Sequence, residues 1–260
     1  VEDLMIKAGE LISKHTGAEA SCPTSCASAA IALTVAALVT KGRYTDMMRL
    51  PDSSGLANQI VLQKGHSINY GAPMATMIRL GGGVPVEVGQ DVEEAICDKT
   101  AALLYVKSHH SVQKGMVSIE KMRDIAHAQG LPFMMDCAAE EDFRKYIALG
   151  ADVVTYSGAK ALEATTSGFV TGRADIVRNV QRQYVGIGRA MKVGKEQIVG
   201  LLEAMDQYEQ RDHRAELAAN VAKVDWLIDE VNKIPGLKAE KIQDEAGRAI
   251  YRCRVTFDGK

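Results

Sequence analysis

Aromatic residues and cysteines are scarce in this chain of 260 residues, and neither sign of charge predominates. Aromatic side chains make up 5% of the residues. The five cysteines have no paired spacing, which argues against a disulfide framework and favours a reducing, cytoplasmic compartment. The 31 basic and 33 acidic residues give a net charge of −2, so the chain lacks the basic footprint of a nonspecific nucleic-acid binder.

Long apolar runs are also missing. The longest, over residues 27–39, contains Ser28 and Thr34 and is too short to cross a bilayer, and no signal peptide precedes it. With 47% apolar and 25% charged residues, the composition is that of a globular protein long enough to bury a large core. The chain begins at Val1 and ends soon after a strand-like run, so we expect a fragment or a processed chain.

Strand-like apolar runs alternate with amphipathic helical segments over most of the chain. The periodicity predicts helices over residues 1–16, 27–40, 71–80, 118–129 and 140–149, and strands over 59–63, 84–88, 100–107, 131–135, 152–156 and 168–172. Residues 21–25 are short, small and polar. Such alternation predicts an α/β fold with a mostly parallel sheet that helices cover on both faces. A long helical pattern over 196–231 and a small α+β piece divide the chain into domains 1–200 and 201–260, of which we expect the second to be incomplete.

Two strand ends carry an acid and a lysine. Ligands of parallel α/β sheets bind beyond the carboxyl ends of the strands, so the residues that follow each strand are candidates. Asp136 ends one strand, and Lys160 follows the next after a turn of small residues. Pyridoxal phosphate needs this pair, because a lysine forms its Schiff base and a carboxylate keeps its pyridine nitrogen protonated. The spacing alone fits a helix-capping aspartate and a solvated lysine equally well.

Small residues open the apolar helix predicted over 27–40. Ser25, Cys26 and Ala27 allow an anion to approach the free N–H groups of the first turn, where the helix dipole favours a phosphate. Ser157, three residues before Lys160, offers a hydroxyl to the same phosphate. The alternative is that Ser25 simply caps the helix.

Histidines and basic residues supply further candidates. His66, His109 and His110 follow strands, where an imidazole can stack on a cofactor ring, cap a helix or face solvent. A zinc site at Cys22 and Cys26 would lack the usual second cysteine pair.

The segment 186–195 contains a G-x-G sequence without a third glycine or a preceding strand, so it fails as a dinucleotide loop. Its Arg189, Lys192 and Lys195 are candidate ligands of a substrate carboxylate or phosphate, or else the solvated start of a helix.

Several of these runs together resemble a known family. They are DCAAEED over 136–142, YSGAKALE over 156–163, SCASA over 25–29, KGHSINYGAP over 64–73, KSHHSVQK over 107–114 and GIGRAMKVGK over 186–195. The chain resembles fold-type I pyridoxal-phosphate enzymes of the selenocysteine-synthase-like family, and within it the branch of D-glucosaminate-6-phosphate ammonia-lyases. Two departures are Ala164-Thr165, where relatives often carry Gly-Pro, and the family's N-terminal arm, which this sequence does not include.

The resemblance implies roles for the candidate residues. Lys160 would form the Schiff base and Asp136 would pair with the pyridine nitrogen. The cofactor's phosphate would be held by Ser25, Cys26, Ala27 and Ser157. His66 would stack on the cofactor ring, and His109 would lie near its O3′. Arg189 and Lys192 would bind the substrate's anionic groups.

The implied activity is an ammonia-lyase reaction that removes water and ammonia from a phosphorylated 2-amino sugar acid, such as D-glucosaminate 6-phosphate, to give a 2-keto-3-deoxy acid phosphate. The implied assembly is a homodimer or a larger homo-oligomer. One alternative is an L-seryl-tRNA(Sec) selenium transferase, which the net charge of −2 disfavours. Another is a non-catalytic member of the fold.

Overall fold

The computed structural model describes residues 2–111 and 116–257. The chain divides into two units, Val1–Tyr208 and Glu209–Lys260, and the division falls in the last turn of helix α8 (Lys195–Gln210). No helix among the described residues is long and apolar enough to span a membrane.

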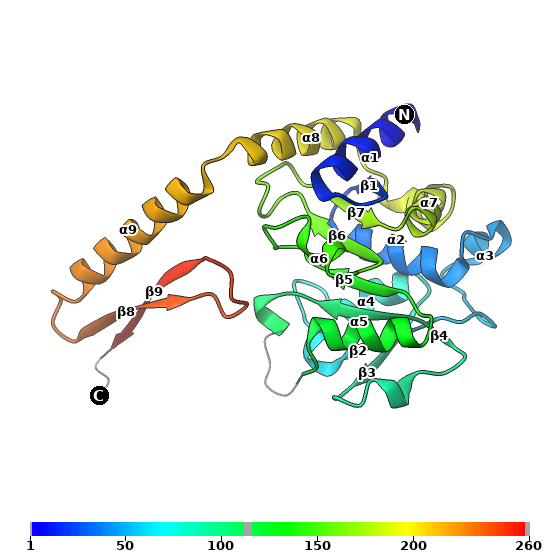
Figure 1. Ribbon diagram of the computed structural model, residues 1–260, viewed down its shortest axis with the longest axis horizontal. Helices are drawn as coiled ribbons and strands as arrows, with labels where there is room; N and C mark the ends of the chain where they lie inside the picture. Colours follow the sequence, from blue (N-terminus) through cyan, green and yellow to red (C-terminus); the bar gives the residue numbers. More distant parts are fainter. Residues whose placement is uncertain (1, 112–115, 258–260) are drawn as a thin grey trace. The chain divides into compact units, whose positions relative to one another are not determined.

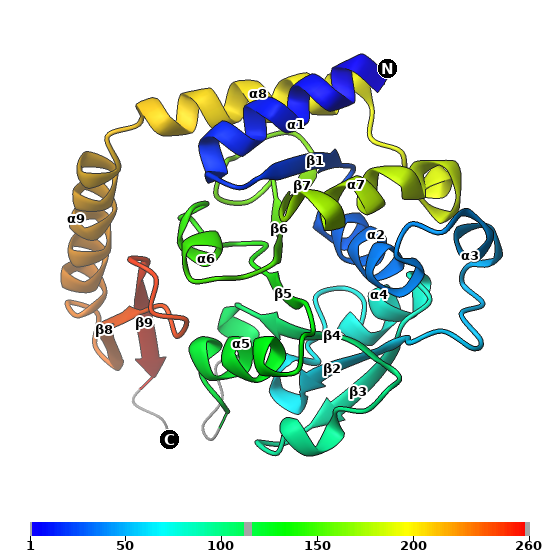
Figure 2. The same ribbon diagram turned by 45° about the vertical axis from the view of Figure 1, so that its right-hand side comes forward.

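A seven-stranded sheet forms the centre of the first unit (Figures 1 and 2). Its strand order is β1-β7-β6-β5-β4-β2-β3. The strands are β1 (Ala20–Thr24), β2 (Gln59–Gln63), β3 (Val84–Val88), β4 (Thr100–Val106), β5 (Phe133–Asp136), β6 (Val153–Ser157) and β7 (Gly168–Gly172). β6, β5, β4, β2 and β3 are parallel, whereas β7 runs antiparallel to both β1 and β6. The predicted mostly parallel α/β sheet is confirmed.

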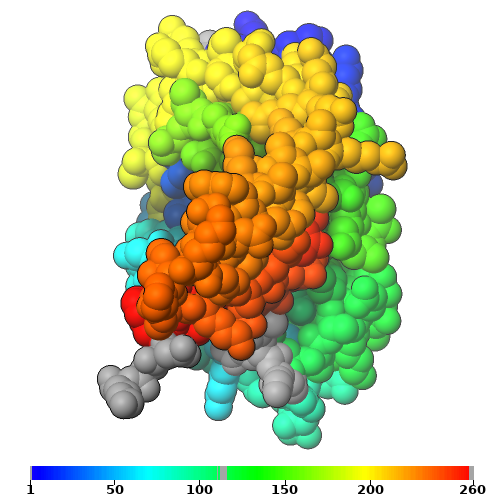
Figure 3. Space-filling view, turned by 90° about the vertical axis from the view of Figure 1, so that its left-hand side faces the viewer, coloured from blue at the N-terminus to red at the C-terminus, as the bar shows by residue number. Residues whose placement is uncertain are grey.

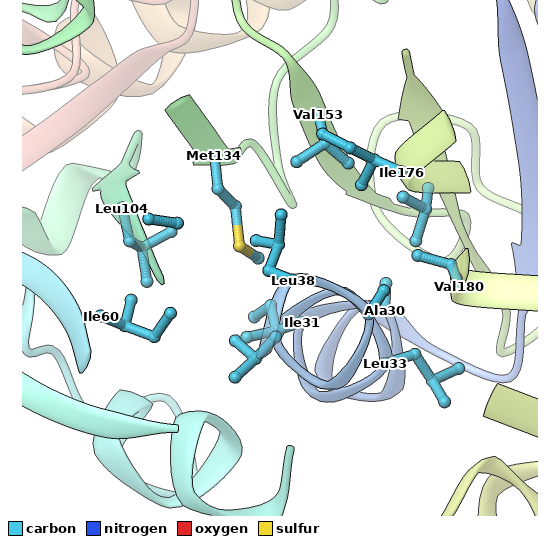
Figure 4. Close-up of a cluster of buried hydrophobic side chains, with 14 of the residues drawn as sticks. Ala30, Ile31, Leu33, Leu38, Ile60, Leu104, Met134, Val153, Ile176 and Val180 are labelled. Atoms are coloured by element: carbon cyan, nitrogen blue, oxygen red, sulfur yellow. The ribbon is translucent and has the colours of Figure 1, made fainter. Parts of the chain in front are cut away.

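Helices cover both faces of this sheet, because alternate strand residues point to opposite sides. One face packs on α2 (Ala27–Thr40), α4 (Met74–Leu80) and α7 (Ala174–Arg182), and Figure 4 shows part of this core. The other face packs on α1 (Glu2–Thr16), α5 (Ile119–Ala128), α6 (Lys145–Ala148) and α8. α1 and α8 lie side by side (Figures 1 and 2).

Helix α2 is buried along almost its whole length, which explains its alanine-rich, uniformly apolar sequence. The sulfur of Cys26 caps its first turn by accepting from the Ala29 N–H. At its far end Lys41 adopts a left-handed conformation (φ 48°), and its N–H reaches the Ala37 carbonyl. The turn that follows α4 packs closely on α2, since a Cβ on Gly81 would lie 2.4 Å from the Ala32 carbonyl oxygen.

Four elements differ from the sequence predictions. Residues 20–24 form strand β1, an edge strand that tolerates Pro23 because it has a partner strand on one side only. α3 (Tyr44–Arg49) was not predicted. α4 begins only after Pro73. α6 covers only the end of the helix predicted over 140–149, because Asp142 caps a turn there by accepting from the backbone N–H groups of residues 144 and 145.

The second unit contains α9 (His213–Val231) and an antiparallel pair of strands, β8 (Leu237–Gln243) and β9 (Tyr251–Phe257). α9 is visible as an exposed surface in Figure 3 (orange), and none of its residues is fully buried. Asp244 begins the connection between the strands, where its buried carboxylate accepts from Arg248 and Arg252. The Arg248 and Arg252 hydrogen bonds hold the pKa of Asp244 far below its usual range.

Candidate active site

Asp136 is the last residue of β5, and its side chain is buried on the sheet face that packs against α2. Only 5% of the residue is exposed, and the Thr155 hydroxyl donates to its Oδ1 at 2.8 Å. Burial raises the pKa of Asp136 to about 6, while the Thr155 hydrogen bond and the positive charge of Lys160 oppose that rise. The carboxyl therefore lies within electrostatic reach of the Lys160 ammonium.

Lys160 lies in a tight turn between β6 and β7. The Ala164 N–H donates to the Gly158 carbonyl at 2.9 Å, and the Glu163 N–H donates to the Lys160 carbonyl at 2.9 Å. Glu163 adopts a left-handed conformation (φ 55°) to close the turn. This backbone holds Lys160 at the carboxyl end of the sheet with its side chain exposed.

The start of α2 has the features of an anion site. Cys26 satisfies the Ala29 and Ala30 N–H groups, whereas the N–H groups of Ala27 and Ser28 have no hydrogen-bond partner among the described residues. Such free donors at the positive end of a helix dipole favour a phosphate.

Gly168 brings Ser157 up to this helix start. Gly168 pairs with Ser157 in the sheet register. A Cβ on Gly168 would lie 2.6 Å from the Cys26 carbonyl carbon and 2.8 Å from the Ala27 nitrogen. A glycine at this position is therefore required for β7 to lie so close to α2, and it brings Ser157, Cys26 and Ala27 into one region.

Ser25 binds a different partner. Its hydroxyl donates to the Met191 carbonyl at 3.2 Å, which ties the start of α2 to the 3₁₀ segment Ile187–Met191. The hydroxyl proton of Ser25 is thus engaged within the protein.

His66 ends the 3₁₀ segment Lys64–His66 that follows β2, and it is completely buried. Its ring packs on Tyr105 with the ring centroids 4.1 Å apart. Neither ring nitrogen has a hydrogen-bond partner among the described residues. Burial lowers the pKa of His66 to about 4, so the imidazole is neutral at physiological pH.

His109 begins the 3₁₀ segment His109–Ser111, which contacts the segment of His66. The Lys107 N–H donates to the Asp136 carbonyl at 2.8 Å, so the chain leading to His109 leaves the sheet beside Asp136. The two candidate histidine segments are therefore neighbours at the carboxyl end of the sheet.

Tyr70 lies in the run 64–73 that carries the resemblance, but the sequence assigns it no role, because an aromatic residue in a loop carries no specific signal. Its hydroxyl is buried and forms no hydrogen bond of normal geometry with a described residue. Burial raises the pKa of Tyr70 to about 12; the nearby Ser28 hydroxyl lowers it, and the charge of Asp136 adds to the rise. Tyr70 therefore lies within electrostatic reach of both the start of α2 and Asp136.

Arg189 and Lys192 lie apart from these groups. Both line a cavity of about 580 Å³ that is also lined by residues of α1 and α7, and neither Lys160 nor Asp136 contributes to its wall. The structure thus brings together Asp136, Lys160, Ser157 and the start of α2. It places the two cations in an adjoining region that the Ser25–Met191 hydrogen bond connects to α2.

Comparison with known proteins assigns the family. The sequence profile described as L-seryl-tRNA selenium transferase (SelA) matches residues 75–256. The chain belongs to this SelA family. It is 50% identical to the D-glucosaminate-6-phosphate ammonia lyase of Salmonella typhimurium, over 98% of this chain and 70% of that protein. It is 43% identical to a 5'-C-glycyluridine monooxygenase-decarboxylase of a Streptomyces species, over 99% of this chain and 67% of that protein.

Solved structures agree with this family and its fold. A structure of D-glucosaminate-6-phosphate ammonia-lyase superposes with a TM-score of 0.87 at 50% identity, over 98% of this chain and 70% of that chain. The pyridoxal-5'-phosphate-dependent protein YhfS from Escherichia coli shares the fold at 16% identity, with a TM-score of 0.63 over 92% of this chain and 62% of that chain. The fold of the SelA-family chain is that of fold-type I pyridoxal-phosphate enzymes.

Proposed function

We propose that this chain is a pyridoxal-phosphate-dependent ammonia-lyase that acts on a phosphorylated 2-amino sugar acid such as D-glucosaminate 6-phosphate. The observation that carries the proposal is the buried carboxyl of Asp136 within electrostatic reach of Lys160, at the carboxyl ends of two adjacent strands. The choice of substrate is supported by the 50% identity to the Salmonella ammonia lyase. The intact pair argues against a non-catalytic member of the fold.

The unpaired polar groups of the site fit pyridoxal phosphate. The free N–H groups of Ala27 and Ser28, with Cys26 and Ser157 beside them, would hold the phosphate, and Ser25 would contribute by positioning its backbone. The unpaired imidazole of His66 would lie against the ring, and His109 would lie near its O3′ edge. Bound there, the cofactor supplies an electron-accepting ring that stabilises negative charge at the substrate's α-carbon.

The chain's own residues would then perform three tasks. Asp136 would keep the pyridine nitrogen protonated, and a cation placed opposite it would lower its raised pKa and keep it ionised. The Nζ of Lys160 would remove the α-proton as a general base. Arg189 and Lys192 would bind the substrate's anionic groups, and the 3-hydroxyl would leave as water before ammonia is released.

An absorption experiment tests this proposal. The wild-type protein mixed with pyridoxal phosphate should show a visible band that borohydride abolishes, and D-glucosaminate 6-phosphate should yield ammonia and a 2-keto-3-deoxy acid in equal amounts. Lys160→Ala should lack both the band and the turnover. Lys99→Ala, an exposed lysine just before β4 at the opposite end of the sheet, should retain both. A wild-type protein without the band would refute the proposal.

Selenium transfer to seryl-tRNA is the second candidate, because the matching family profile carries that description. The net charge of −2 disfavours a tRNA partner. The Streptomyces relative, 43% identical to this chain, is named for a different reaction, so the substrate assay and not the cofactor band distinguishes these activities. Selenium incorporation into seryl-tRNA without turnover of the sugar acid would favour the transferase.

We further propose a cytoplasmic homodimer or larger homo-oligomer. The five cysteines are free thiols, in keeping with a reducing compartment. Lys160 is exposed in the single chain, and a second copy would shield it from water. Light scattering of the cofactor-loaded protein should give at least twice the mass of the chain.

A further inference from the structure

A cavity of about 580 Å³ lies against α1, α7 and the segment Ile187–Met191. Its wall combines apolar side chains, including Met5, Ile6 and Val193, with four cationic ones. The volume lies within the range of small-molecule sites, and an apolar wall with a few polar groups is their usual composition. Of the described residues, Asp136, Lys160, Thr155 and Ser157 are absent from the wall of this cavity.

Four cations converge on this cavity: Arg178, Arg182, Arg189 and Lys192. None of them forms an ion pair or a side-chain hydrogen bond with a described residue. Among the described residues of the wall, Glu2 is the one carboxylate, and it pairs with none of the four. Like charges around one cavity repel one another, and a bound anion would relieve that repulsion.

The arginines of the first unit show that this arrangement is unusual within the protein. Of its nine arginines, five are held by an acidic side chain or, for Arg144, by a backbone carbonyl. Four have no such partner among the described residues, and three of those four line this one cavity, the exception being Arg79. Surface arginines in general thus find partners here, whereas the cavity leaves its arginines available.

We propose that this cavity binds a small molecule that carries phosphate or carboxylate groups, with Arg178 and Arg182 of α7 as its ligands beside Arg189 and Lys192. Planar guanidinium groups bind such oxyanions through paired N–H donors, and the apolar wall accommodates the carbon skeleton. The binding site does not depend on the lyase proposal, although the ligand can be the phosphate end of the lyase substrate.

Calorimetric titration with inorganic phosphate at constant ionic strength tests this inference. The protein is first loaded with pyridoxal phosphate, so that the anion site at the start of α2 is already filled. The wild type should bind phosphate saturably, and Arg178→Gln/Arg182→Gln should weaken the binding at least tenfold. Arg79→Gln is the matched control, an exposed unpaired arginine outside the cavity, and should bind like the wild type. Circular dichroism should show all variants folded.

Absence of saturable binding in the wild type, or equal binding by the folded double variant, would overturn the inference. Kinetics with D-glucosaminate 6-phosphate identify the source of the ligand. A raised KM with an unchanged kcat in the double variant supports a subsite for the substrate's phosphate, whereas an unchanged KM with weakened phosphate binding supports a separate anionic ligand. If the wild type lacks lyase activity altogether, the lyase proposal fails and the phosphate titration still decides the inference.

Discussion

The buried carboxyl of Asp136 should destabilise the cofactor-free protein at neutral pH. Its pKa rises from 3.8 to about 6 on folding because burial disfavours the charged form. A shift of this size corresponds to about 3 kcal/mol, at 1.36 kcal/mol per pKa unit. Asp136→Asn removes the charge and keeps an oxygen that can accept from the Thr155 hydroxyl. We therefore expect the variant to be more stable than the wild type at pH 7.5, by up to about 3 kcal/mol.

The raised pKa of Asp136 also fixes how the free energy of unfolding changes with pH. Well below pH 3.8 the carboxyl is protonated in both folded and unfolded chains, so burial has no electrostatic cost. As the pH rises toward 6, the unfolded chain ionises first and the folded state loses stability; above that pH the loss is constant. The difference in unfolding free energy between Asp136→Asn and the wild type should grow by about 2 kcal/mol from about pH 4.5 to 7.5.

Urea denaturation of both cofactor-free proteins across this pH range measures that difference. Taking the difference removes the contributions of all groups that the two proteins share. Thr155→Val should move the rise to higher pH, because the Thr155 hydrogen bond lowers the pKa of Asp136. A difference that does not change with pH would refute the argument. The same Asn variant should lose retention of pyridoxal phosphate and lyase turnover, so that stability and function change in opposite directions.

Three further predictions concern packing and charge. Gly168→Ala should destabilise the protein by roughly 1–3 kcal/mol in urea denaturation and weaken cofactor binding, since its Cβ would overlap the Ala27 nitrogen. His66→Phe keeps a ring against Tyr105. As the pH falls from 6.5 toward 4, the wild type should lose stability because the histidine of the unfolded chain binds a proton before that of the folded chain, and the variant should lose less. A difference in unfolding free energy between variant and wild type that stays constant over this range would contradict the prediction. Asp244→Ala should lower the protection of β8 and β9 amides against hydrogen exchange, because it leaves Arg248 and Arg252 without their shared carboxylate. Equal protection in the variant and the wild type would argue that Asp244 does not stabilise this pair of strands.

The sequence predicted most elements because local patterns report burial directly. The predicted ranges 27–40, 59–63, 84–88 and 168–172 coincide with α2, β2, β3 and β7. β1 escaped prediction because its five residues gain their strand conformation from pairing with β7, which lies about 150 residues away in the chain. The predicted helix over 140–149 failed for the opposite reason: local side-chain contacts hold its first half in a turn, where Asp142 accepts from the backbone N–H groups of residues 144 and 145 and the buried Glu140 accepts from the Tyr146 hydroxyl.

By itself the sequence determined the sheet class, the placement of Asp136 and Lys160 after successive strands, and the small-residue start of α2, because continuous apolar runs and strand-end positions are local properties. Only the tertiary structure decided which groups meet. Thr155 became the partner of Asp136 through the register of β5 and β6, and Gly168 joined Ser157 to α2. The same packing turned Arg189 and Lys192 toward a cavity shared with α7, since contacts between distant segments depend on how the helices cover the sheet.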